Sequence, residues 1–319
     1  MRLLFLITAY GQQDQLRRLC ATLRRLDSAC LISVQFDESD EPFRDDLASL
    51  GVQAYRTKHD VRWGDGSYLD ELLRSLERSL AQSWQWLVLL SGQDYPLRPI
   101  DALQDHLSTR NAMGMLWSEL VPPPGPRATW TELQRRYWFQ HWWVPAWLWR
   151  AGGGSVVVGR ALRLLLAAPG LRRRLYFRSR PAGESGGVGR LASRTPFTTD
   201  RPCRKGADYF ALRRELVTEL VASARSDSAL LDYFRRTAVP SEAWFHTVLG
   251  ASQGEALLPE LLHFTRFEGG ARPRSQVESD FDEAQGSGRF FARKFDASSQ
   301  TLLDRIDAQL LGLPSAPRS

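Results

Sequence analysis

Short apolar runs alternate with segments of helical periodicity through the first third of the chain, and this alternation restricts the fold more than any other feature of the sequence. Leu3 to Thr8 and Trp86 to Leu90 are nearly unbroken apolar runs, as expected of parallel strands that are buried on both faces. Gln12 to Leu26 and Ser67 to Gln82 carry leucines at helical spacing. The alternation predicts an α/β fold, with a mainly parallel sheet and helices on both of its faces.

The same criteria place further elements along the chain. We expect strands at Cys30 to Phe36, Val52 to Arg56, Met113 to Trp117, Tyr209 to Leu212, Leu261 to Phe267 and Phe290 to Phe295. We expect helices at Ile100 to Ser108, Glu215 to Ala224, Trp244 to Leu249 and Ser298 to Leu311.

The segment from about residue 122 to about residue 200 has a different character. It opens with a proline-rich linker, continues through a helix-like stretch rich in tryptophan, and ends in sequence dominated by glycine, serine and arginine. We therefore expect a single domain, residues 1–319, with an insertion at about 122–200. Core packing is the simpler role for the tryptophans, and a platform on which a sugar ring stacks is the alternative.

The balance of charge leaves several classes of partner open. The net charge is +6 and the pI is near 9.5, which suits nucleic acid, anionic lipid or a phosphorylated small molecule. The chain has 39 arginines but only three lysines, Lys58, Lys205 and Lys294. A lysine kept in such a background indicates a position where a compact ammonium is needed, although chance also leaves a few.

Cysteine spacing and hydropathy indicate the cellular compartment in which we expect the protein. Cys20, Cys30 and Cys203 lie far apart, in neither a metal-binding nor a redox spacing. We see no apolar stretch of the roughly eighteen residues that a membrane span needs. We therefore expect a cytoplasmic protein, with peripheral contact between its arginine-rich insertion and the membrane surface as a further option.

Four segments carry the chemistry. They read LLSGQDYPL at 89–97, KGADYFAL at 205–212, PSEAWFHT at 240–247 and FFARKF at 290–295. Together they resemble the core-2/I-branching N-acetylglucosaminyltransferase and peptide O-xylosyltransferase family. Its hallmarks are a strand ending in S-G-x-D-x-P, a K-G-S-x-W-F-x-L-like segment, a P-D-E turn and a terminal F-A-R-K-F, in this same order.

The resemblance implies a GT-A-like fold and an inverting transfer of N-acetylglucosamine or xylose from a UDP-sugar to a hydroxyl of a glycan, lipid-linked glycan or protein. It also implies no cofactor and no metal, because basic side chains hold the diphosphate. Such a transfer needs a base on the acceptor hydroxyl and positive charge on the departing diphosphate.

Two residues match the family's central positions. Glu242 matches the catalytic base of the P-D-E turn, and the structural alternative is a carboxylate that stabilises a helix start. Lys294 matches the diphosphate-binding lysine, and the alternative is a solvated cation. If the segment is extended, the side chains of Arg293 and Lys294 point to opposite faces, and we favour Lys294 as the one that binds the diphosphate. The family's partner arginine matches Arg266, with Arg272 and Arg274 as alternatives.

The resemblance also assigns substrate contacts. Asp37, at the end of the second strand, and Trp63 match nucleoside-binding positions, although Gln35 stands where the family usually has histidine. Asp208 is expected to face the acceptor. Asp94 accepts a hydrogen bond either from the acceptor sugar or within a structural turn, and as a lone carboxylate it makes a poor metal site.

Two other functions remain as alternatives. A non-catalytic sugar-binding member of the same fold would lack the base and the diphosphate cation, which this chain has. A basic nucleic-acid-binding protein would fit the pI, but no recognised motif supports it, since the arginines are dispersed among acidic residues.

Overall fold

The computed structural model describes residues 1–36, 41–57, 61–62, 64–123, 130–144, 175–179, 186–253, 256–269 and 273–313. Asp37, Trp63, Lys58, Arg272 and the arginine run at 172–174 lie outside the described residues.

A seven-stranded sheet forms the centre of the molecule, in the order β13-β6-β12-β4-β1-β2-β3. Its strands are β1 (Leu3–Ala9), β2 (Leu31–Phe36), β3 (Gln53–Arg56), β4 (Trp86–Ser91), β6 (Gly114–Met115), β12 (Ala211–Arg213) and β13 (Leu257–Leu258). Strand β12 is antiparallel to both of its neighbours, and all other neighbouring pairs are parallel. The prediction of a mainly parallel α/β sheet is therefore confirmed.

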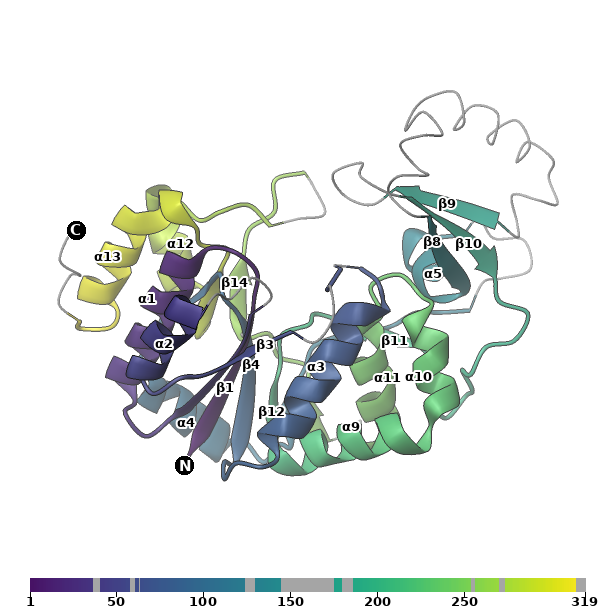
Figure 1. The fold of residues 1–319 in the computed structure, drawn as a ribbon, viewed down its shortest axis with the longest axis horizontal. Helices are drawn as coiled ribbons and strands as arrows, with labels where there is room; N and C mark the ends of the chain where they lie inside the picture. Colours follow the sequence, from purple (N-terminus) through teal and green to yellow (C-terminus); the bar gives the residue numbers. More distant parts are fainter. Residues whose placement is uncertain are drawn as a thin grey trace.

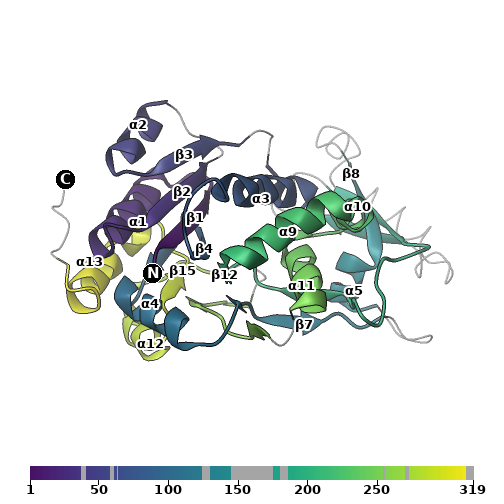
Figure 2. The same ribbon diagram turned by 90° about the horizontal axis from the view of Figure 1, so that it is seen from below.

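Helices cover both faces of the sheet (Figures 1 and 2). One face carries α1 (Gln13–Leu26), α4 (Ile100–Thr109), α12 (Phe281–Gly286) and α13 (Gln300–Gln309), with α2 (Glu41–Ser49) beside them. The other carries α3 (Gly66–Ser79), α9 (Arg214–Ser226), α10 (Ser228–Arg235) and α11 (Ser241–Ser252). Most lie where the periodicity predicted a helix, but α2, α10 and α12 were not expected.

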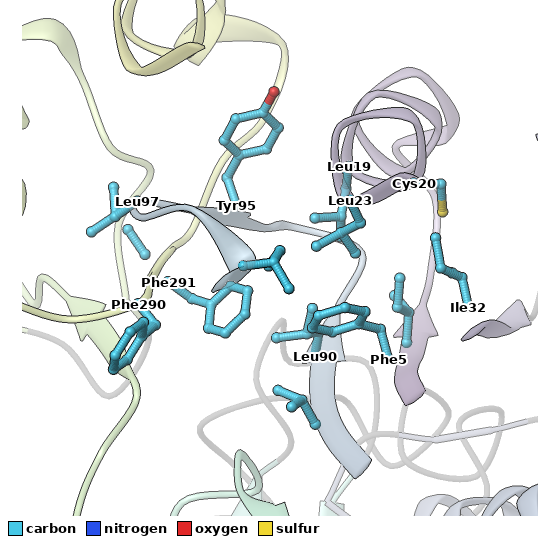
Figure 3. Close-up of a cluster of buried hydrophobic side chains, with 14 of the residues drawn as sticks. Phe5, Leu19, Cys20, Leu23, Ile32, Leu90, Tyr95, Leu97, Phe290 and Phe291 are labelled. Carbon is cyan, nitrogen blue, oxygen red and sulfur yellow. The ribbon is translucent and has the colours of Figure 1, made fainter. Parts of the chain in front are cut away.

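The two cores follow from the two-residue period of the strands. In β1, Phe5 belongs to the core under α1, whereas Leu4 and Leu6 belong to the core under α3. Figure 3 shows Phe5 facing Leu19 of α1, with Phe291 beside it. An unbroken apolar run is what a strand covered on both faces requires.

Two smaller sheets extend this framework towards the site. Strand β15 (Phe291–Arg293) pairs parallel with β14 (His263–Thr265) and antiparallel with β5 (Asp94–Pro96). Strand β11 (Arg204–Gly206) pairs antiparallel with β7 (Ser118–Leu120).

The insertion contributes α5 (Glu132–Tyr137) and a sheet in the order β8-β10-β9. Its strands are β8 (Phe139–Val144), β9 (Leu175–Ser179) and β10 (Gly186–Leu191). Figure 1 shows this sheet at the end of the molecule away from α13. The expected tryptophan-rich helix is wrong for 139–144, because these residues pair as a strand with β10. Trp147 and Trp149 lie outside the described residues.

Gly206 allows β11 to approach α11 closely. A Cβ at this position would lie 2.1 Å from the carbonyl oxygen of Trp117 and 2.2 Å from Cε1 of His246. The His246 ring is fixed there, because its Nε2 lies 3.0 Å from the carbonyl oxygen of Ala207. The glycine of the K-G segment is therefore required by packing.

We expect Gly206→Ala to lower the free energy of unfolding by at least about 1–3 kcal/mol, because the methyl group overlaps both backbone and a buried ring. Urea denaturation measures the change. Gly286→Ala is the control, since a Cβ there meets nothing within 4 Å. Equal stability of the two variants would contradict the packing argument.

Candidate functional site

The site lies where β1 and β4 end, as expected for a ligand site in an open parallel sheet. The turn after β4 presses against β1, since a Cβ on Gly92 would lie 2.8 Å from Cβ of Ala9. Thr8 at the end of β1 lies with its Oγ1 3.2 Å from Oη of Tyr68 on α3. The S-G-Q-D sequence thus builds a tight turn that directs Asp94 inwards.

Asp94 is the anchor of a buried ionic cluster. Its side chain has no exposed area, and its Oδ2 accepts a hydrogen bond from the backbone N–H of Ser91 at 2.7 Å. Nε2 of His263 lies 3.1 Å from the same oxygen, and Nε of Arg293 lies 3.4 Å from Oδ1. The carboxylate has no surface through which to touch an acceptor in this structure, and its contacts are those of the turn alternative.

Arg293 is held by this cluster and by an aromatic ring. Its guanidinium carbon lies 4.1 Å from the centroid of the Tyr209 ring. Burial alone would lower the pKa of Arg293, but its electrostatic interactions with Tyr209 and with the carboxylate of Asp94 raise the pKa above its ordinary value. Arg293 therefore remains a cation inside the protein.

Glu242 lies in the first turn of α11, as the sequence predicts. Its side chain is 22% exposed, and its Oε2 accepts a hydrogen bond from Nη1 of Arg136 at 3.2 Å. Arg136 comes from α5, within the insertion, and it also lies 3.7 Å from Glu132. Sequence analysis missed Arg136, because nothing local distinguishes it from the other arginines of that segment.

Asp208 interacts with groups of both clusters. Its carboxyl group is hydrogen-bonded to Ser241, and the charges of Glu242, Arg293 and Lys205 act on it. Its Oδ1 is buried and makes no hydrogen bond to the part of the chain that the structure describes. Burial, and next the charge of Glu242, raise the pKa of Asp208 to about 7. The carboxyl group of Asp208 is therefore influenced both by the expected base and by Arg293 of β15.

Lys294 directly follows Arg293 at the end of β15. Its charge acts on the carboxylate of Asp296, and we find no ion pair of its ammonium among the described residues. The pairing of Thr265 with Arg293 brings Arg266 to the same edge.

The arginines expected to assist Lys294 are already paired with acids. Arg266 forms ion pairs with Glu283 and Asp280, the latter at 3.3 Å. Arg274 binds both oxygens of Asp280 at 2.6 Å. Either arginine could reach a diphosphate only by giving up carboxylate contacts, which makes Lys294 the better placed cation.

Gln35 shows what replaces the usual histidine beside the nucleoside position. Its Nε2 donates to Oε1 of Glu71 at 2.9 Å, and its Oε1 accepts from Oγ of Ser75 at 2.5 Å. Arg74 completes the group by binding Glu71 at 2.7 Å. This polar network joins β2 to α3 and leaves no free hydrogen-bonding end on Gln35 that we can identify among the described contacts.

In the described part of the chain, no three histidine, cysteine, aspartate or glutamate side chains lie together so that they could hold a metal ion. None of the helices described is both long and apolar enough to cross a membrane.

Comparison with known proteins confirms the resemblance inferred from the motifs. A family model described as "Core-2/I-Branching enzyme" matches residues 5–123. The chain is 25% identical to "Xylosyltransferase oxt" of Drosophila melanogaster over 98% of its own length and 34% of that protein. It is 24% identical to "Xylosyltransferase 1" of Mus musculus, over 83% of this chain and 26% of that one. The chain thus spans between about a quarter and a third of the length of these relatives.

Among solved structures, the chain is similar to glucosyl-3-phosphoglycerate synthase from Mycobacterium tuberculosis. The identity is 13% and the TM-score 0.31, over 72% of this chain and 67% of that one. The α/β class assigned above rests on the strand order of this chain and not on that likeness.

We expect Asp94→Ala to lower the free energy of unfolding by about 3–5 kcal/mol, because it leaves the Arg293 guanidinium buried without its carboxylate. Asp46→Ala is the control, since it removes an exposed partner of Arg17 at 2.6 Å and should cost at most about 1 kcal/mol. Chemical denaturation of both variants decides the matter. Similar losses of unfolding free energy in the two variants would show that the buried cluster contributes no more stability than an exposed ion pair.

Proposed function

We propose that this chain is an inverting, metal-independent glycosyltransferase that moves N-acetylglucosamine or xylose from a UDP-sugar to a hydroxyl of a glycan, lipid-linked glycan or protein. One observation carries the proposal: the charges of Glu242 and of Arg293 both act on the buried carboxyl group of Asp208. The expected base and the cation that precedes Lys294 in the chain therefore belong to one cluster. The xylosyltransferase names of the curated relatives support the class of reaction.

Glu242 is the general base of the proposed reaction. It is partly exposed, so that an acceptor hydroxyl can approach it, and Arg136 holds it in the anionic form that can take a proton. As the hydroxyl oxygen bonds to the sugar carbon, its proton passes to Glu242. The bond from that carbon to the diphosphate oxygen breaks, and its electron pair leaves with UDP.

Lys294 stabilises the negative charge that develops on the departing diphosphate. Its ammonium lies at the end of β15, where Arg293 is fixed by Asp94. A rigid strand end places the charge in advance, which makes it more effective in the transition state. Arg266 lies at the same edge and is a second, weaker candidate because of its carboxylate partners. Peripheral contact with a membrane surface remains part of the proposal for lipid-linked acceptors.

We expect release of UDP from UDP-sugars to continue in the presence of EDTA, and Glu242→Gln to lower kcat by roughly a hundredfold to ten-thousandfold while leaving donor binding intact. Glu132→Gln is the matched control, because Glu132 also lies beside Arg136 but is 50% exposed. A screen of UDP-N-acetylglucosamine, UDP-xylose and other UDP-sugars measures turnover. Activity that disappears with EDTA and returns with Mn²⁺ would refute metal independence.

We expect Lys294→Ala to weaken UDP binding by roughly tenfold to a hundredfold, as the loss of a charge-assisted hydrogen bond predicts. Isothermal titration calorimetry with UDP measures this directly. Lys294→Arg should restore part of the affinity, whereas Arg225→Ala, which removes a 69% exposed cation elsewhere, should change nothing. Unchanged binding by Lys294→Ala would remove Lys294 from the site.

A further inference from the structure

Two carboxyl groups from separate segments share this site. Asp208 follows β11, and Glu242 lies in the first turn of α11. The charge of Glu242 acts on Asp208, and the charges of both residues act on Tyr137. Two carboxylates sharing a site cannot both ionise without repulsion.

Several elements contribute polar or charged groups that interact with Asp208. They are Ser241 and Glu242 of α11, Lys205 of β11, Arg293 of β15, Tyr68 of α3, Tyr137 of α5, and Tyr209 beside it in the chain. Lys205 and Arg293 favour an ionised Asp208, whereas burial and the charge of Glu242 oppose it.

The two carboxyl groups differ in what binds them. Oε2 of Glu242 receives a hydrogen bond from Arg136 at 3.2 Å, which stabilises its anion. Oδ1 of Asp208 is buried and has no hydrogen-bond partner in the described structure. An anionic oxygen in that position pays the full cost of desolvation, whereas a protonated one does not.

We propose that Glu242 and Asp208 share a single proton, which resides on Asp208 while Arg136 keeps Glu242 anionic. The inference rests on the proposed function, in which Glu242 is the base. It makes Asp208 and Arg136 positioning residues, because both act through Glu242. Arg136 links the insertion to the base, so the folding of α5 contributes to the activity of a residue on α11.

The proton count through one transfer is balanced. The pair begins with one proton, on Asp208, and Glu242 gains the proton of the acceptor hydroxyl as the new bond to the sugar carbon forms. UDP leaves with the electron pair of the broken bond. The second proton then passes to solvent, and the pair returns to one proton and one negative charge.

The direction of pH dependence follows from this arrangement. Burial and Glu242 raise the pKa of Asp208 to about 7, so the shared proton is present below that pH and is lost above it. Above it, the pair carries two negative charges, which oppose the approach of an anionic sugar nucleotide. We expect kcat/KM to fall by about threefold to tenfold between pH 7 and pH 8.5.

Infrared titration of the unliganded protein detects the proton directly. Ordinary carboxyl groups have lost their protons by about pH 6, so a protonated carboxyl band that disappears near pH 7 belongs to a shifted group. We expect this band in the wild type and in Glu132→Gln, and its loss in Asp208→Asn. In Glu242→Gln, the pH at which half of this band has disappeared should fall by about one unit. In Arg136→Gln, that pH should rise. A band that persists in Asp208→Asn, or no band in the wild type, overturns the proposal.

Kinetics provides the second test. Asp208→Asn imitates the protonated side chain, so the decline of kcat/KM between pH 7 and pH 8.5 should disappear in this variant. A hundredfold loss at pH 7 in a folded Asp208→Asn protein would mean that Asp208 acts as an anion, and would overturn the proposal. If Asp208→Asn does not fold, the midpoint in Glu242→Gln decides.

The two proposals fail in different ways. If the wild type transfers no sugar from any UDP-sugar, the proposed function fails, while the infrared band still decides whether the proton is shared. If transfer occurs but the band is unaffected by Asp208→Asn, the shared proton is refuted and the function stands.

Discussion

The buried contact between Asp94 and Arg293 is the constraint on which the arrangement of the site depends. It joins the turn after β4 to β15, two segments almost two hundred residues apart in a 319-residue chain. The contact closes a loop of about two hundred residues, and once buried neither charge can be left alone without a large cost. Because Lys294 follows Arg293 directly, the same contact also positions Lys294.

The elements that could be predicted from the sequence are those that local sequence patterns determine. β1 and β4 are apolar without interruption because helices cover both faces of the sheet. The leucines of α3 repeat at helical spacing, so this helix could be predicted from the sequence. β8 was expected to be helical because an aromatic run carries no clear period, and its pairing with β10 depends on residues more than forty positions away. Short elements such as α10 have too few turns to display a period.

The same distinction separates the site residues that could be predicted from those that could not. Glu242 and Lys294 stand in motifs whose residue types are set by the chemistry of transfer. Arg136 has no motif, and its role comes from a contact 106 positions along the chain. Arg266 was expected near the diphosphate because of its place beside β15, which the pairing of β14 supports, but its carboxylate partners could not be inferred from spacing.

The charges of the site explain why one carboxyl group should stay protonated. Asp94 offsets Arg293 and Glu242 offsets Arg136, while Lys294, whose charge also acts on Asp296, and Lys205, whose charge acts on Asp208, contribute further positive charge to this region. An ionised Asp208 would cancel that charge in the same cluster and would weaken the attraction for a diphosphate. A neutral Asp208 leaves it in place. While Asp208 is protonated, an anionic base and a cationic leaving-group site can coexist in this cluster, because its carboxyl group then carries no charge.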